Sequence, residues 1–323
     1  MAHGGFQTQV EHTKKALETA GLAVEHLRWW DADQKGDIIH FFGAAPVDYV
    51  NRARGKSFRV IQTPLFTETC NRSDLRLKMQ GAMVRTILAV PAGAGIKRQL
   101  NWESFGLCDM NVVGLEAERQ VLEWVYGVPP ARISIVPLGM SQEFLTAGAA
   151  PARGDFLICV GTITERKNTV TLARMAHEAE VPILFVGKPY DVSDPYWEKF
   201  AALIDNRWVR HNSHVENSTE LIKLYHGARG AVVMSRCENW SLAAHEAAAC
   251  GLPLLLPPLK WAKERFGADA HYFSSDEKEN IRVLQRFYEQ ARTLPAPNVR
   301  LYSWNEVGAR LSQIYADLAA VSR

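Results

Sequence analysis

Two glutamates stand eight residues apart in the second half of the chain, in a setting that favours ligand chemistry. Glu238 and Glu246 lie in the segment R-C-E-N-W-S-L-A-A-H-E-A-A-A-C-G-L-P, residues 236–253. An apolar run before it predicts a buried strand, and the alanine-rich run after Ser241 predicts a helix that ends at Gly251. Glu238 is therefore expected in the turn between strand and helix. Glu246 is expected on the helix, on the order of 10 Å farther along its axis.

This arrangement suits a nucleotide diphosphate sugar. The helix N-terminus between the two carboxylates offers free N–H groups and the positive end of the helix dipole, and both favour a phosphate. Sugar hydroxyls and ribose hydroxyls flank the pyrophosphate of such a molecule, as the glutamates flank the helix start. Open α/β sheets also bind ligands at the carboxyl ends of their strands. Two solvated surface glutamates are the plain alternative, and the strand–turn–helix context weighs against it.

Strand-like and helix-like segments alternate along the whole chain. Strands that are apolar throughout and separated by helices predict parallel sheets covered on both faces. The Gly/Ala/Pro-rich stretch 146–154 reads as a linker, so the sequence predicts two Rossmann-like domains with a cleft between them. The expected strands are 22–27, 37–43, 57–64, 110–114, 132–139, 155–162, 181–188, 208–212 and 229–234, with helices at 8–20, 116–126 and 304–322.

Length and composition are those of a packed globular protein. The chain has 323 residues, 47% of them hydrophobic and 22% charged, which predicts two domains of about 150 residues each. The net charge of +2 gives no reason to expect a nucleic-acid partner. Five scattered cysteines without a C-x-x-C pair predict buried thiols in a reducing compartment. We find neither a signal segment nor an apolar run near ~20 residues, and expect a cytoplasmic protein.

Six segments, in order, resemble the GT-B-fold glycosyltransferases of the large retaining group that uses nucleotide-sugar donors. They are G-G-F-Q-T-Q-V, D-I-I-H-F-F-G, the stretch Cys108–Phe144, V-G-T-I-T-E-R-K-N, the E-x7-E segment that contains Glu238 and Glu246, and Y-S-W-N near the end. The resemblance implies an acceptor-side domain over 1–147 that lacks the usual first strand, and a donor-binding domain over 153–302. It also implies a C-terminal helix, 303–323, that crosses back onto the first domain.

The same resemblance implies roles for particular residues. Negative charge grows on the phosphate that leaves a glycosyl donor, and a site without a metal or another cofactor must meet it with fixed cations and N–H dipoles. Lys167 is the expected cation, with Arg166 beside it. Glu238 would lie near the transferred sugar, and Glu246 would accept the ribose hydroxyls. The other expected donor-binding residues are Gly4, Gly5, Gly161, Thr162, Asn239, Trp240, Ser241 and Leu242.

Three departures from the family pattern leave alternatives open. Thr162 stands where many relatives carry arginine, and Leu65 where they often carry histidine. The chain also begins at the glycine turn, without the strand that usually precedes it.

The expected partners are a nucleotide sugar and a glycan, lipid-linked or small-molecule acceptor. A non-catalytic module that binds a nucleotide sugar or a protein, and a nucleotide-sugar epimerase, are the alternatives. The D-A-D triplet at 31–33 is expected to be a solvated turn rather than a metal site.

The stretch from Arg52 to Arg98 is strongly basic. It holds ten lysines and arginines against Glu68 and Asp74, a net charge of ten minus two, or +8. Scattered surface charge is one reading. The other is attraction to an anionic acceptor or to lipid headgroups, which would place the protein peripherally at the inner face of a membrane.

Overall fold

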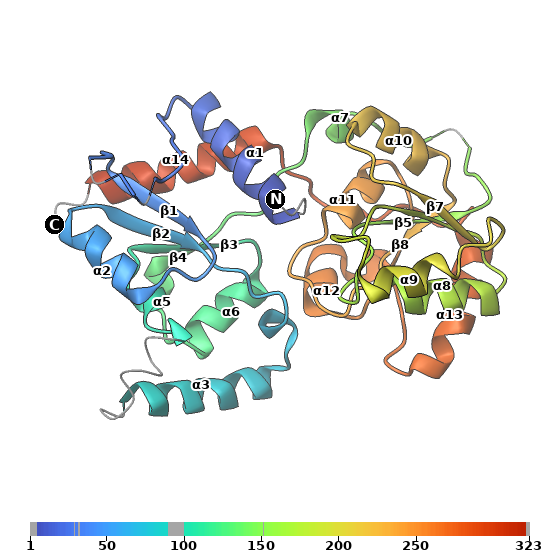
Figure 1. Cartoon of the computed structure of the whole chain (residues 1–323), viewed down its shortest axis with the longest axis horizontal. Coiled ribbons are helices and arrows are strands. Elements are labelled where there is room, and N and C mark those ends of the chain that lie inside the picture. Colours follow the sequence, from blue (N-terminus) through green and yellow to red (C-terminus); the bar gives the residue numbers. More distant parts are fainter. Residues whose placement is uncertain (1–4, 29, 32, 90–99, 151, 321–323) are drawn as a thin grey trace. The chain divides into compact units, whose positions relative to one another are not determined.

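The computed structural model describes residues 5–28, 30–31, 33–89, 100–150 and 152–320 (Figure 1). The chain folds into two compact units. The C-terminal unit holds residues 5–8 and 140–303, and the N-terminal unit holds residues 9–139 and 304–320, so the boundary falls within the first helix, after Thr8. Each unit contains a parallel sheet with helices packed against it, which confirms the predicted α/β class.

The N-terminal sheet has four parallel strands in the order β1-β2-β3-β4. Its strands are β1 (Ile38–Phe42), β2 (Arg59–Thr63), β3 (Met110–Val113) and β4 (Ile133–Ile135). Figure 1 shows helices α1 (Gly5–Thr19) and α14 (Trp304–Ala320) on one face and α2 (Val47–Gly55), α5 (Ser104–Leu107) and α6 (Glu116–Trp124) on the other. The period-2 alternation of β1 agrees with this, because Ile39 and Phe41 pack in the α2 cluster while His40 contacts Tyr315 of α14.

The predicted strand at 22–27 is wrong. This segment has no regular secondary structure, and most of its side chains are exposed. Its backbone finds a side-chain partner instead of a neighbouring strand, because Gln34 Nε2 donates to the carbonyl of His26 at 3.1 Å and Gln34 Oε1 accepts from the N–H of Arg28 at 2.8 Å. A short, largely apolar segment becomes a strand only where a sheet edge is available to pair with it.

Helix α14 is packed on α1 within the N-terminal unit. A Cβ atom added at Gly308 would lie 2.6 Å from the carbonyl oxygen of Ala16, so the two backbones approach as closely as glycine allows. Val307, Leu311 and Tyr315 are buried along the same helix. The first turn of α14 is also held, since the ring of Trp304 stacks on His12 with centroids 5.1 Å apart.

The C-terminal sheet has six parallel strands in the order β10-β9-β8-β5-β6-β7. The strands are β5 (Leu157–Val160), β6 (Ile183–Val186), β7 (Val209–Asn212), β8 (Gly230–Val232), β9 (Leu254–Leu256) and β10 (His271–Tyr272). The chain adds β6 and β7 on one side of β5 and then returns to add β8 on the other. The strand order therefore reverses between β5 and β8, and such a switch point opens a crevice at the carboxyl ends of the two strands.

Seven α-helices complete the described part of the C-terminal unit. They are α7 (Gln142–Leu145), α8 (Thr169–Glu178), α9 (Pro195–Ala201), α10 (Ser218–His226), α11 (Leu242–Ala249), α12 (Lys260–Phe266) and α13 (Asn280–Gln290). The stretch expected to be a linker, 146–154, lies inside this unit. The physical reason is packing just before the stretch and within it. The rings of Phe144 and Tyr225 have centroids 6.1 Å apart, and Ala149 packs against Gly251.

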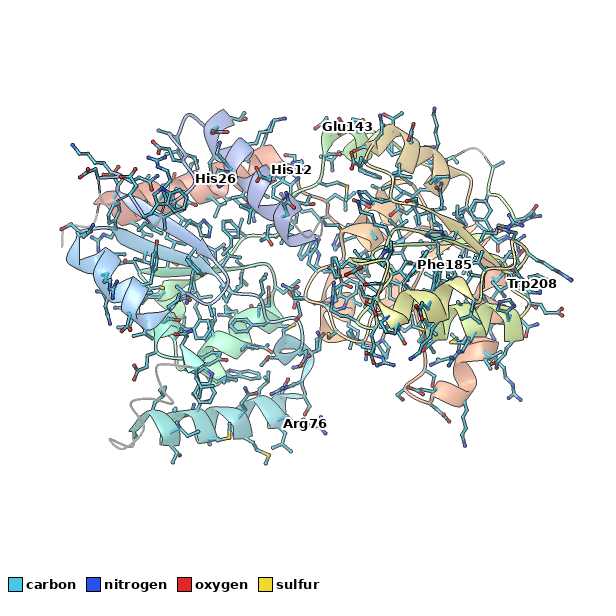
Figure 2. All side chains as sticks on the ribbon, in the orientation of Figure 1. His12, His26, Arg76, Glu143, Phe185 and Trp208 are labelled. Atoms are coloured by element: carbon cyan, nitrogen blue, oxygen red, sulfur yellow. The ribbon has the colours of Figure 1, made fainter. Side chains whose placement is uncertain are left out.

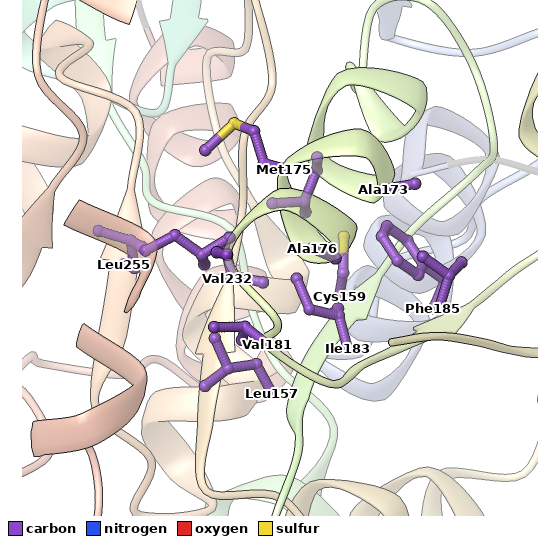
Figure 3. Packing of buried hydrophobic residues seen from close by; sticks show 14 of the residues in the cluster. Leu157, Cys159, Ala173, Met175, Ala176, Val181, Ile183, Phe185, Val232 and Leu255 are labelled. Carbon is purple, nitrogen blue, oxygen red and sulfur yellow. The ribbon is translucent and has the colours of Figure 1, made fainter. Parts of the chain in front are cut away.

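The core of the C-terminal unit joins the central strands to α8 (Figure 3). Leu157, Ile183 and Phe185 are fully buried, and Ala173 and Ala176 of α8 pack beside them. Burying each large side chain stabilises the fold by roughly 1.5–3 kcal/mol. Four of the five cysteines are buried as expected, and Cys237 is partly exposed. This core holds β5 and β8 rigidly side by side, which fixes the loops that leave them.

Candidate functional site

Two loops leave the switch point of the C-terminal sheet, one after β5 and one after β8. The first begins at Gly161, whose φ of 152° lies outside the range that most side chains adopt. It packs against Gly187 at the end of β6, where an added Cβ atom would lie 2.0 Å from the carbonyl oxygen of Gly161. Thr162 follows, partly buried and uncharged. The backbone of the β5 loop therefore lies closer to residue 187 than any side chain at that position would permit.

An ion pair joins the two loops. Lys167 Nζ lies 2.8 Å from one carboxylate oxygen of Glu238 and 3.0 Å from the other. Glu238 is buried and Lys167 nearly so, with exposed side-chain fractions of 7% and 15%. Arg166 adds a second cation 3.9 Å from the same carboxylate. The group of three carries a net charge of +1, since two cations face one anion, and this suits the approach of an anionic ligand.

Hydrogen bonds to backbone carbonyls also connect the two loops. The N–H of Arg236 donates to the carbonyl of Arg166 at 2.9 Å, and Arg166 Nη1 donates to the carbonyl of Cys237 at 3.4 Å. Arg236 also pairs with Glu165 at 2.8 Å on the exposed side. The structure thus brings Glu238 together with Lys167 and Arg166, which the sequence predicts in a separate segment.

Helix α11 begins shortly after Glu238 in the chain. Ser241 is its N-cap, and Ser241 Oγ accepts a hydrogen bond from the N–H of Ala244 at 3.3 Å. Asn239 and Trp240 form the turn before the cap, and Leu242 is the first helical residue. The first N–H groups of a helix have no intrahelical acceptor, so this end of α11 can donate to a phosphate.

Three stacked side chains, which no sequence motif indicates, pack at the turn before α11. The ring of Trp240 lies parallel to that of His245, with centroids 4.5 Å apart, and the Arg265 guanidinium lies 4.8 Å above Trp240. Burial lowers the pKa of His245 to about 3, which keeps the imidazole neutral. Its Nδ1 then donates to the carbonyl of Ser241 at 2.7 Å, and its Nε2 accepts from Arg265 Nε at 3.3 Å.

Glu246 lies on α11 in a different environment from Glu238. Burial raises the pKa of Glu246 to about 7, partly offset by a hydrogen bond from the Tyr225 hydroxyl, which lies 3.1 Å from Oε2. Tyr225 is fully buried and also contacts the carbonyl of Ala243 at 3.3 Å. One glutamate of the pair is thus neutralised by a cation, and the other is close to half protonated at neutral pH. The role of Tyr225 is invisible in the sequence, because an isolated tyrosine on α10 carries no motif.

Two hydroxyls near these loops are buried without a hydrogen-bond partner among the described residues: Thr169 Oγ1, at the start of α8, and Ser235 Oγ, after β8. Both side chains are about 2% exposed. A buried polar group without a partner is costly and tends to mark a place of functional interest. Serine and threonine are too common in turns for the sequence to have singled these two out.

Other predicted site residues lie outside the cluster of Lys167, Arg166 and Glu238. Gly4 lies outside the described residues, and Gly5 is the first residue of α1, which begins three residues earlier than the sequence predicts. In the D-A-D segment, Asp31 Oδ1 accepts from the N–H of Asp33 at 3.0 Å and Asp31 Oδ2 pairs with Arg28 at 3.0 Å. These contacts form a local turn, as expected.

The N-terminal unit has a narrow pocket near the carboxyl ends of its strands. Its cavity of about 20 Å³ has room for roughly one water molecule. His40 is its central polar group: Nε2 lies 2.8 Å from Thr63 Oγ1 and Nδ1 lies 2.6 Å from the Tyr315 hydroxyl. Burial lowers the pKa of His40 to about 4, so the ring is neutral. The lining includes Gln9, Thr13, Phe42, Trp304, Val307 and Leu311.

The chain resembles curated glycosyltransferases at low identity. It is 25% identical over 205 residues to an MMP alpha-(1->4)-mannosyltransferase of Mycolicibacterium hassiacum, covering 59% of this chain and 49% of that protein. It is 26% identical over 160 residues to a D-inositol 3-phosphate glycosyltransferase of Mycobacterium sp. strain KMS, covering 46% of this chain and 36% of that protein. The matches thus span half or less of these relatives. No protein-family profile matches the chain.

Solved structures give the fold. A glycosyltransferase from Rickettsia africae superposes with a TM-score of 0.64 at 13% identity, covering 100% of this chain and 97% of that one. Sucrose-phosphate synthase from Thermosynechococcus elongatus gives 0.61 at 20% identity over 98% and 79% of the two chains. Anabaena HepE in complex with UDP gives 0.59 at 12% identity over 96% and 82%. Among the described residues, no helix is both long and apolar enough to span a bilayer. With its two parallel α/β sheets, the chain has the GT-B fold of glycosyltransferases.

Proposed function

We propose that this chain transfers a hexosyl group from a nucleotide-diphosphate sugar to a hydroxyl of a glycan, lipid-linked or small-molecule acceptor. We further propose that it retains the anomeric configuration and needs neither metal nor another cofactor. The observation that carries the proposal is the ion-paired cluster of Lys167, Arg166 and Glu238 at the β5–β8 switch point, next to the start of α11. The glycosyltransferase names of the relatives support the reaction class, and the UDP complex of HepE supports the donor class.

In the proposed reaction the bond between the anomeric carbon and the phosphate oxygen breaks, and the acceptor oxygen bonds to the same face of that carbon. The electron pair of the broken bond stays on the leaving nucleotide diphosphate, which takes the acceptor proton. Lys167 and Arg166 stabilise the charge that grows on this phosphate, and the first N–H groups of α11 donate to it. Fixed cations of this kind supply the stabilisation for which other transferases use a metal ion.

The two glutamates have separate tasks in this proposal. Glu238 holds Lys167 in place through the ion pair and faces the transferred sugar, whose hydroxyls can donate to it. Glu246 accepts the ribose hydroxyls in its deprotonated form. The Trp240–His245–Arg265 stack keeps the turn between them rigid, because His245 bonds the carbonyl of the cap residue Ser241. Asn239, Leu242, Gly161 and Thr162 would contribute backbone around the diphosphate.

The test is a panel of UDP-, GDP- and ADP-sugars incubated with the full chain, with nucleotide release and thermal stabilisation measured in parallel. We expect stabilisation by one nucleotide class, and release of that nucleotide in the presence of a suitable acceptor. Stabilisation without turnover would favour the binding module. Conversion of the donor to its epimer without nucleotide release would favour the epimerase. Neither stabilisation nor conversion by any donor would contradict the proposal.

A further inference from the structure

Helix α3 (Asp74–Ala89) carries apolar side chains on two opposite faces. Leu77, Gly81 and Val84 form the inner face, and all three are buried. This face is pressed against α6, because a Cβ atom at Gly81 would lie only 2.0 Å from the carbonyl oxygen of Trp124. Such a close approach fixes the rotation of α3 about its own axis, and with it the direction in which the rest of the helix points.

The outer face carries Leu75, Met79 and Met83, here called the outer stripe. Their exposed fractions are 69%, 64% and 51%. They are spaced four residues apart, so at 100° per residue they lie within an arc of about 80°, opposite the inner face. Figure 1 shows α3 as an outlying helix of its unit, beyond α6. Single exposed apolar residues are ordinary, but three in one row along a helix mark a contact surface.

Basic residues border the outer stripe on both sides. Arg76 lies on one margin, and Figure 2 shows it near the N-terminal end of α3. Lys78 and Arg85 lie on the other margin, where Lys78 Nζ is 5.2 Å from the Trp124 ring centroid and Arg85 Nη1 donates to the Trp124 carbonyl at 3.0 Å. On the helix itself these three cations face one anion, Asp74, at the first turn. An apolar row between basic margins is the pattern of a helix that lies in a membrane interface.

We propose that α3 docks the protein on an anionic lipid surface. In this arrangement the outer stripe enters the boundary between headgroups and acyl chains, and Arg76, Lys78 and Arg85 lie at headgroup level. The charge distribution selects this occupant over a second copy of the chain, because two such helices face to face would bring like charges together. The stripe is also narrow, three side chains on a helix about 24 Å long, whereas a stable protein interface takes roughly 20–30 residues a side.

This proposal concerns one part of the basic segment Arg52–Arg98, and it does not depend on glycosyl transfer. Lys97 and Arg98 lie outside the described residues. Arg59 pairs with Asp109 at 3.3 Å, and Arg54 Nη1 donates to the carbonyl of Leu107 at 3.1 Å. Arg54 lies on α2 and Arg59 on β2, and neither element carries a large exposed apolar side chain. The basic groups that border an apolar row belong to α3.

The experiment is sedimentation of the full chain with phosphatidylcholine vesicles that contain or lack phosphatidylglycerol, at low and high salt and without any donor. We expect binding to the anionic vesicles, weakened by salt. Replacing the outer stripe together (Leu75→Gln, Met79→Gln, Met83→Gln) should lower vesicle partition at least about tenfold. The double variant Arg76→Gln, Lys78→Gln should lower it by about fivefold for each charge removed.

The matched control is the double variant Tyr190→Gln, Val192→Gln, which removes two apolar side chains that are 57% and 75% exposed in the C-terminal unit. It should bind vesicles like the wild type. All these positions are exposed, so an unchanged melting temperature verifies folding. Absence of binding to anionic vesicles, equal binding to neutral ones, or wild-type binding by the outer-stripe variant would each overturn the proposal. So would a wild-type dimer in sedimentation velocity that the outer-stripe variant converts to a monomer.

Discussion

Lys167 and Glu238 are 71 residues apart in the chain, and Lys167 Nζ contacts both carboxylate oxygens of Glu238, at 2.8 and 3.0 Å. Their loops leave β5 and β8, which are neighbours only because the sheet changes direction between them. We therefore expect the pair to contribute both to the stability of the C-terminal unit and to the reaction proposed for it. These two contributions can be separated by mutation.

Lys167→Ala should reduce both stability and turnover. It removes the closest cation from the buried Glu238 carboxylate, which we expect to cost about 3 kcal/mol in the free energy of unfolding. Loss of the cation should lower nucleotide release by about a hundredfold or more. The double variant Lys167→Met, Glu238→Gln removes both charges and should recover most of the stability without recovering turnover. Urea unfolding and a nucleotide-release assay measure the two quantities, and wild-type turnover in Lys167→Ala would show that the cation is misassigned.

Glu246 should make stability fall as the pH rises. Its pKa is about 7 in the folded chain and about 4.5 in the unfolded chain, so the folded state binds more protons between these values. The destabilisation is absent below about pH 4.5, grows as the pH rises toward 7 and then levels off at about 3 kcal/mol. Glu246→Gln should remove this slope in urea unfolding measured across the range. An identical pH profile for the variant would mean that the carboxyl is not the group responsible.

Donor affinity should show the opposite pH dependence. The carboxylate form of Glu246 can accept two ribose hydroxyls, whereas the protonated form has to donate one hydrogen bond itself. Binding of the nucleotide should therefore strengthen as the pH rises through about 7. Isothermal titration calorimetry with the nucleotide identified in the donor panel measures this. A 2′-deoxyribose analogue is the matched control, since it should bind more weakly and with a smaller pH effect.

Tyr225→Phe should shift that pH dependence upward. The Tyr225 hydroxyl donates to Glu246 Oε2 at 3.1 Å and lowers the pKa of this carboxyl against the larger effect of burial. Without the hydroxyl, the carboxyl should deprotonate at a higher pH, and the midpoint of donor binding should follow. The ring volume is nearly unchanged, so the loss of stability should be about 1 kcal/mol. An unmoved midpoint would indicate that another group controls the titration.

Gly187→Ala should disturb the β5 loop from outside the site. The new methyl group would overlap the carbonyl oxygen of Gly161, which is 2.0 Å from the Cβ position, and the φ of 153° at Gly187 adds backbone strain. We expect a loss of about 1–3 kcal/mol in the free energy of unfolding, together with weaker donor binding. Gly55→Ala is the control, because nothing lies within 4 Å of its Cβ position. Equal stability of the two variants would contradict the packing argument.

Much of the C-terminal unit could be predicted from the sequence. Its central strands are short apolar runs bounded by glycine or proline, and a strand buried on both faces has few other ways to satisfy its backbone. The predictions of strands at 155–162, 181–188, 208–212 and 229–234 are therefore confirmed within a few residues. The strand predicted at 22–27 is wrong, because a short apolar segment does not reveal whether a sheet edge is there to pair with it.

The sequence by itself determined that Glu238 follows a strand and Glu246 sits on the next helix, because local hydrophobic runs and a capping serine set those elements. Only the tertiary structure decided which groups each carboxyl contacts. Strand order brought Lys167 to Glu238, and the packing of α10 brought Tyr225 to Glu246, which gave two glutamates of one motif opposite electrostatic environments. The two apolar faces of α3 show the same limit. Composition cannot say which face is buried, whereas the close contact of Gly81 with α6 decides it and leaves the outer stripe to solvent.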